Sequence, residues 1–126
     1  MASQNNITDS NFVVKHFVNF VNDGTSAITV DASGFNDHQS GSSKLHIKRI
    51  KWSLNNAVTI AFVGTGTTTG ITLAGNTSGH LNGPRIPNAA TVSGATAGDI
   101  TLTPATTGTY GFVYLELEKQ NFGSGT

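Results

Sequence analysis

Short runs of alternating apolar and polar residues, separated by turn residues, make up most of this chain. Such runs lie at 11–21, 27–30, 44–54, 57–63, 71–74, 99–103 and 110–119. A period of two is that of a β-strand, and no stretch keeps a helical period beyond a turn or two. We therefore predict one all-β domain of about seven or eight short antiparallel strands, folded as a jelly-roll-like sandwich or barrel.

The run 44–54 changes phase in its middle. Its apolar residues form two sets on opposite strand faces, Leu45 and Ile47 first and then Ile50, Trp52 and Leu54. A β-bulge near Lys48 and Arg49 would return both sets to one face, because a bulge inserts one residue. The alternative is a strand covered on both sides. We expect Trp52 to anchor the core at this strand.

Turn residues suggest how the runs connect. Asp23-Gly24 favours a hairpin after the first run, and Asn55-Asn56 favours a hairpin between 44–54 and 57–63. The segment 75–97 is rich in glycine, asparagine and proline, so we predict no regular element there. The segment 31–43 is expected to be a long polar loop.

Two predicted strands, 11–21 and 110–119, carry apolar groups on both faces, which is more than a strand facing solvent needs. In 110–119, Val113, Leu115 and Leu117 are assigned to the core, which leaves the opposite face without a cover. Either a loop such as 75–97 folds over that face, or a partner does. The candidate interface residues in the whole chain are Ile7, Phe12, Phe17, Phe35, Tyr110, Phe112 and Tyr114.

The charge balance narrows the choice of partners. The 126 residues include seven basic and seven acidic side chains, and only 11% of the chain is charged. This balance argues against nucleic-acid binding, and a surface with so few charges is poorly protected against association.

No apolar run approaches the length of about 20 residues that spans a membrane. Residues 1–10 are expected to form a polar arm, 11–119 the domain, and 120–126 a tail.

Candidate chemistry is sparse. The chain has no cysteine, and its four histidines lack the spacing of a metal site. Glu116 and Glu118 share a strand face, and Lys48, Arg49 and Lys51 are their expected structural partners if the two strands pair. We therefore expect no catalytic site, no metal and no cofactor, and thus no enzyme.

The order of strands in the middle and at the end of the chain resembles small structural proteins of tailed-bacteriophage virions. The segments that carry the resemblance are Leu45–Leu54, Val58–Phe62, Ile71–Asn76, Thr96–Thr103 and the final Tyr110–Lys119 with its Leu-Glu-Leu-Glu-Lys ending. Among these proteins the chain is most similar to capsid decoration, or cement, proteins.

This resemblance implies a decoration protein made in the host cytoplasm, which then binds the outside of the capsid. Its implied partners are the major capsid protein and further copies of itself, most often as a trimer, without nucleic acid or membrane. The alternatives are a carbohydrate- or receptor-binding module of a tail fibre or spike, with Tyr110, Tyr114 or Trp52 stacking on sugars, and another tail or neck component.

Overall fold

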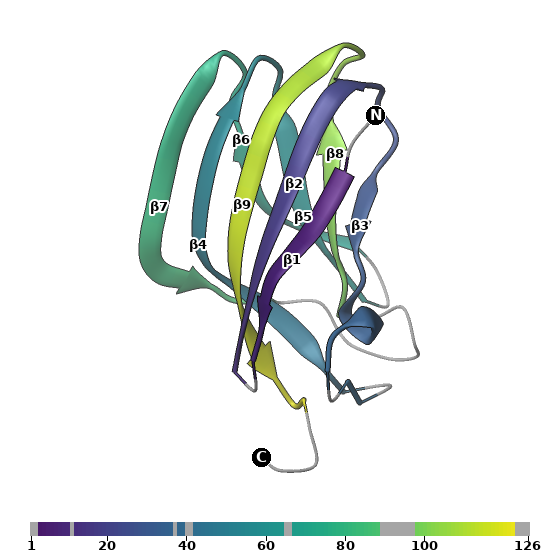
Figure 1. Ribbon diagram of the computed structural model, residues 1–126, viewed down its shortest axis with the longest axis vertical. Helices are drawn as coiled ribbons and strands as arrows, with labels where there is room; N and C mark the ends of the chain where they lie inside the picture. The colour runs from purple at the N-terminus through teal and green to yellow at the C-terminus, as the bar shows by residue number, and fades with distance from the viewer. Residues whose placement is uncertain are drawn as a thin grey trace.

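The computed structural model describes residues 3–10, 12–36, 38–39, 42–64, 67–88 and 98–122, which form two antiparallel sheets packed face to face (Figure 1). Sheet A contains, in order, β1 (Ser3–Asp9), β2 (Val13–Asp23), β9 (Thr109–Gln120), β4 (Lys44–Leu54) and β7 (Thr77–Ile86). Sheet B contains β3 (Ile28–Val30), β8 (Ile100–Pro104), β5 (Val58–Val63) and β6 (Thr67–Leu73). A short 3-10 helix, η1 (Ala32–Gly34), follows β3.

The strand order is that of a jelly roll. Without β1, sheet A reads β2-β9-β4-β7 and sheet B reads β3-β8-β5-β6, so nearly every connection crosses from one sheet to the other. The predicted jelly-roll-like antiparallel sandwich is therefore confirmed. Strand β1 extends sheet A beyond the jelly roll at the edge next to β2.

Both predicted hairpins are wrong for the same reason. The segments after Asp23 and around Asn55 do reverse the chain, but each carries it into the opposite sheet. Asn55 shows why: its backbone N–H donates to the Tyr110 carbonyl at 3.2 Å, and its side-chain oxygen accepts from the Tyr110 N–H at 2.7 Å. These bonds tie the connection to the start of β9, so the chain leaves sheet A there.

The bulge in β4 is confirmed. The ladders of β4 with β7 and with β9 both shift register between Ile47 and Arg49. As a result Ile47 and Ile50 both lie in the core, at 1% and 0% exposure, while Lys48 and Arg49 are consecutive exposed residues. One extra residue thus lets both halves of the strand bury their apolar side chains.

The core lies between the sheets. Its buried side chains include Val14, Val18 and Phe20 from β2, Val113, Leu115 and Leu117 from β9, and Ile60, Phe62, Ile100 and Leu102 from sheet B. Burying each such side chain contributes about 1.5–3 kcal/mol. The assignment of the odd-numbered β9 residues to the core is therefore confirmed.

Strand β7 lies where no regular element was expected. It runs along the free edge of sheet A, where a strand tolerates proline because it has a ladder partner on one side only. Its Gly79 lies opposite Trp52, and a Cβ there would approach the indole ring to 3.0 Å. Trp52 is half-buried, packs against the edge of the core, and donates from Nε1 to Thr77 Oγ1 at 3.2 Å.

The two ends of the chain differ from the expected arm and tail. Ser3–Asp9 form strand β1 rather than a free arm, although six of its seven residues are exposed. Strand β9 continues to Gln120, and Phe122, expected in the tail, is 2% exposed in the core. The sequence did not predict β1, because its residues are polar and lack the apolar alternation of a strand. The strand pairs with β2 through backbone groups, which need no apolar side chains.

The glycine at position 111 allows β9 to approach β4. Gly111 has a φ of +126°, and a Cβ added to it would overlap the carbonyl oxygen of Ser53. We expect Gly111→Ala to lower the free energy of unfolding by at least about 3 kcal/mol, because backbone strain and overlap add. Gly24→Ala is the control, since a Cβ there meets no atom within 4 Å. Equal urea midpoints for the two variants would contradict this account.

Candidate functional site: the β1–β2–β9 surface and the edge pocket

The outer face of sheet A carries an aromatic cluster on two neighbouring strands. Phe17 of β2 lies opposite Tyr114 of β9 in the ladder, and Asn19 lies opposite Phe112. The rings of Phe17 and Phe112 stack with centroids 5.6 Å apart and an interplanar angle of 15°. All three aromatic side chains are only half-buried, because the core already takes the opposite face of both strands.

The exposed hydrophobic side chains lie on the same strands or next to them. Among the described residues the large ones are Ile7 (54%), Phe12 (67%), Val21 (44%) and Tyr110 (51%). They belong to β1, the β1–β2 turn, β2 and β9, three strands that lie side by side (Figure 1). We call these four side chains together with the aromatic cluster the β1–β2–β9 surface. It contains every predicted interface residue except Phe35.

Phe35 was expected at an interface but lies in the core. It is 5% exposed, and its ring meets the ring of His16 edge-on with centroids 6.1 Å apart. The 3-10 helix η1 ends directly before it and turns it inward. The polar loop around Phe35 gave no sign of this, because a single aromatic in a loop has no periodicity.

Charged side chains border the aromatic cluster. Arg49 lies 3.8 Å from Glu116, and Glu118 pairs with Arg85 of β7. Lys51 lies opposite Tyr114 in the ladder. Tyr114 donates from its hydroxyl to Glu116 at 3.2 Å, and burial together with the Glu116 charge raises the pKa of Tyr114. Of the predicted charge partners, the structure thus brings Arg49 to Glu116, whereas Glu118 meets a residue that the sequence did not suggest.

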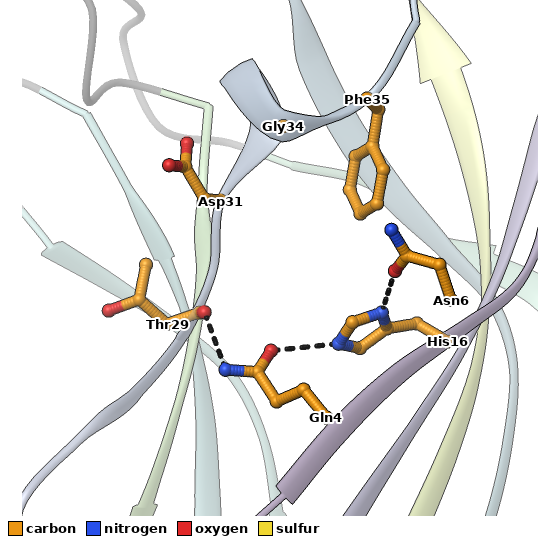
Figure 2. A pocket seen from close by; sticks show the side chains of 7 residues that line it. All are labelled: Gln4, Asn6, His16, Thr29, Asp31, Gly34 and Phe35. Carbon is orange, nitrogen blue, oxygen red and sulfur yellow. Dashed lines mark hydrogen bonds between the residues drawn. The ribbon is translucent and has the colours of Figure 1, made fainter.

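A polar pocket opens where β1 of sheet A faces β3 of sheet B, at one edge of the sandwich. Figure 2 shows Gln4 and Asn6 reaching from β1 toward His16, with Thr29 on the far side and the Phe35 ring close to Asn6. The pocket has a volume of about 310 Å³ and is also lined by Asp31 and Gly34. We call it the edge pocket.

His16 connects three strands through this pocket. Its Nε2 donates to Gln4 Oε1 at 2.8 Å, and the Gln4 amide in turn donates to the Thr29 carbonyl at 3.2 Å. The Asn6 Oδ1 lies against the other ring nitrogen, Nδ1. Burial lowers the pKa of His16. The sequence carries no sign of this cluster, because residues 3–6 are all polar and show no alternation.

Strand β1 is attached almost entirely by polar contacts. None of its side chains belongs to the hydrophobic core. Besides the ladder and the His16 contacts, Asp9 accepts from the Asn36 N–H at 2.8 Å and pairs with Lys119. An element without side chains in the core is among the least stable parts of a domain, so we expect β1 to open most readily.

Few titratable side chains that could bind a metal ion or catalyse a reaction lie close together among the described residues. Within the described ranges, no three His, Cys, Asp or Glu side chains lie close enough to hold a metal ion. His46 is buried, which lowers its pKa, and its Nδ1 accepts from the Asn88 N–H at 2.8 Å. No helix in the part of the chain described is long and apolar enough to cross a membrane.

Comparison of the chain with protein-family models, with curated proteins and with solved structures finds no significant match. The jelly-roll order of the strands and the two surfaces described above are therefore the basis for any functional argument.

Replacing His16 should release β1. We expect His16→Leu to accelerate amide hydrogen exchange in residues 3–9 by about tenfold or more, because the two amide contacts are lost while the apolar volume stays similar. Protection of β9 should change much less. Asn5→Ala, an exposed change on the same strand, is the control and should leave exchange near the wild-type rate. Equal acceleration in β1 and β9 would show that His16 supports the whole fold and not β1 in particular.

Asp99 makes stability depend on pH near the edge pocket. Burial raises the pKa of Asp99 to about 6. The Ala32 N–H, which donates to its carboxylate at 2.7 Å, acts in the opposite direction and lowers the pKa. The folded state therefore binds the proton more tightly than the unfolded state, so the stability contributed by protonated Asp99 is lost as pH rises through about 6. Asp99→Asn should gain stability relative to the wild type between pH 4 and pH 7.5, measured by urea unfolding. A difference that does not change with pH would contradict the assignment.

Proposed function

We propose that this protein is a structural subunit of a bacteriophage virion, a decoration protein that binds the outer capsid surface through its β1–β2–β9 surface. The observation that carries the proposal is that all four exposed large hydrophobic side chains of the described residues lie on three adjacent strands and the turn between two of them. Exposed apolar side chains that gather on one part of a protein surface mark protein interfaces, in which aromatic residues are enriched.

The distribution of charge supports a docking role for this surface. All seven Lys and Arg residues lie on strands of sheet A, whereas the four strands of sheet B contain no charged residue. Sheet A therefore combines an apolar centre with a charged border, which is the anatomy of a specific interface. The partners that fit are the major capsid protein and further copies of this chain, with a trimer as the favoured assembly.

The test is co-sedimentation with capsids of the source phage that were assembled without this protein. We expect Phe17→Ala combined with Phe112→Ala to weaken binding by at least about 30-fold, because central aromatic side chains of an interface each contribute about 1–2 kcal/mol or more. Both residues are half-buried on the outer face of sheet A, so the domain should remain folded.

The matched control is Thr59→Ala combined with Thr101→Ala. These threonines are also half-buried, but they lie on sheet B. Binding should stay within about twofold of the wild type, as is usual for changes outside an interface. Wild-type protein that fails to sediment with the capsids contradicts the decoration role. A loss confined to the threonine pair would place the docking face on sheet B instead.

The alternative is recognition of a carbohydrate, for which one observation speaks against and one in favour. Trp52 packs on the core side of sheet A and Tyr114 on the outer side, so these two rings cannot flank one sugar. The edge pocket, however, presents amides, a carboxylate and an aromatic wall, which suits the hydroxyl groups of one saccharide unit. Glycan-array binding that Asn6→Ala abolishes and Phe112→Ala leaves intact would favour this role.

A further inference from the structure

A second pocket opens beside the bulge of β4 and is lined mainly by cations. Its lining residues are Lys48, Arg49, Asn82, Arg85 and Glu118, and its volume is about 270 Å³. The first two come from β4, the next two from β7 and the last from β9, which are neighbouring strands of sheet A (Figure 1). We call it the basic pocket.

The bulge is what places two of these cations together. In a regular strand, successive side chains point to opposite faces, so either Lys48 or Arg49 would enter the core. The register shift between Ile47 and Arg49 leaves both exposed. Bulges recur where a strand has to re-aim a side chain at a working site.

The partner strand is irregular at the same place. Ile47 pairs with Ile86 and Arg49 pairs with Asn82, so two steps along β4 match four steps along β7. Arg85 is among the additional β7 residues opposite the bulge. Both strands therefore deviate from the regular ladder where they line the basic pocket.

The charges in the pocket do not balance. Its lining has three cationic side chains and one carboxylate, and Glu116 lies 3.8 Å from Arg49, so positive charge exceeds negative charge by one in a chain with a formal net charge of zero. Among the described residues, no carboxylate lies within 4.0 Å of the Lys48 ammonium group. Arg49 and Arg85 each meet a glutamate through one guanidinium nitrogen, and their side chains are 51% and 47% exposed. Each guanidinium has five N–H donors, so donors remain for a ligand.

We propose that the basic pocket binds a tetrahedral oxyanion of the phosphate or sulfate class. Lys48 supplies a point charge, Arg49 and Arg85 supply planar guanidinium forks that suit oxyanions, and the Asn82 amide adds a neutral donor. Glu118 opposes the ligand and limits the affinity. This site borders the aromatic cluster, because Glu116 lies 3.8 Å from Arg49 and accepts from the Tyr114 hydroxyl. The proposal does not depend on the proposed docking role.

The test is a titration of isotope-labelled protein with sodium phosphate and, separately, with sodium sulfate, followed by NMR. Sodium chloride at matched ionic strength is the reference. We expect saturable shifts of the backbone amides of Lys48, Arg49, Asn82 and Arg85 with at least one of the two oxyanions. Lys48→Ala should weaken binding by about tenfold, as expected for loss of one charge-assisted contact.

Two further variants separate a site from general surface charge. Lys51→Ala removes the same charge from an exposed position on the same strand outside the pocket, and should change the affinity by about twofold or less. Glu118→Gln removes the opposing carboxylate and should tighten binding by about threefold or more. Shifts that match those in sodium chloride would overturn the proposal. So would equal losses in Lys48→Ala and Lys51→Ala.

Discussion

Strand β9 is hydrogen-bonded along both sides, to β2 and to β4, and this pairing determines where each of its side chains points. Val113, Leu115 and Leu117 are fully buried between the sheets, so the intervening residues have to face outward. Phe112 and Tyr114 therefore lie on the outer face of sheet A, where both are half-buried. The core and the aromatic part of the β1–β2–β9 surface are thus two consequences of one strand periodicity.

Periodicity also marks the limit of what the sequence could predict. It was sufficient for the sandwich, the two faces of β9 and the bulge at Lys48, because each of these depends on side chains within one strand. It could not assign connections to sheets, since turn residues such as Asn55 report a reversal and not its direction. It missed β7, a glycine-containing edge strand, and the His16 cluster, because both depend on contacts between residues far apart in the chain.

The two sheets differ in their charged and exposed apolar side chains. Sheet B has no charged residue, and its outer face presents threonines, namely Thr29, Thr59, Thr72, Thr101 and Thr103. Sheet A has all the Lys and Arg residues of the chain, the exposed hydrophobic side chains and the basic pocket. A domain with an uncharged sheet on one side and a sheet with charged and apolar groups on the other is well suited to a fixed orientation in an assembly.

The proposed docking of the β1–β2–β9 surface on a capsid is tested most directly by imaging the virion. An electron cryomicroscopy map of the source phage, at a resolution that separates the two sheets, would show which face of the jelly roll meets the capsid shell. The account predicts that β1, β2 and β9 lie against the neighbouring subunits, with Phe17 and Phe112 covered. A virion in which this surface faces solvent, or which contains no copy of the protein, would contradict it.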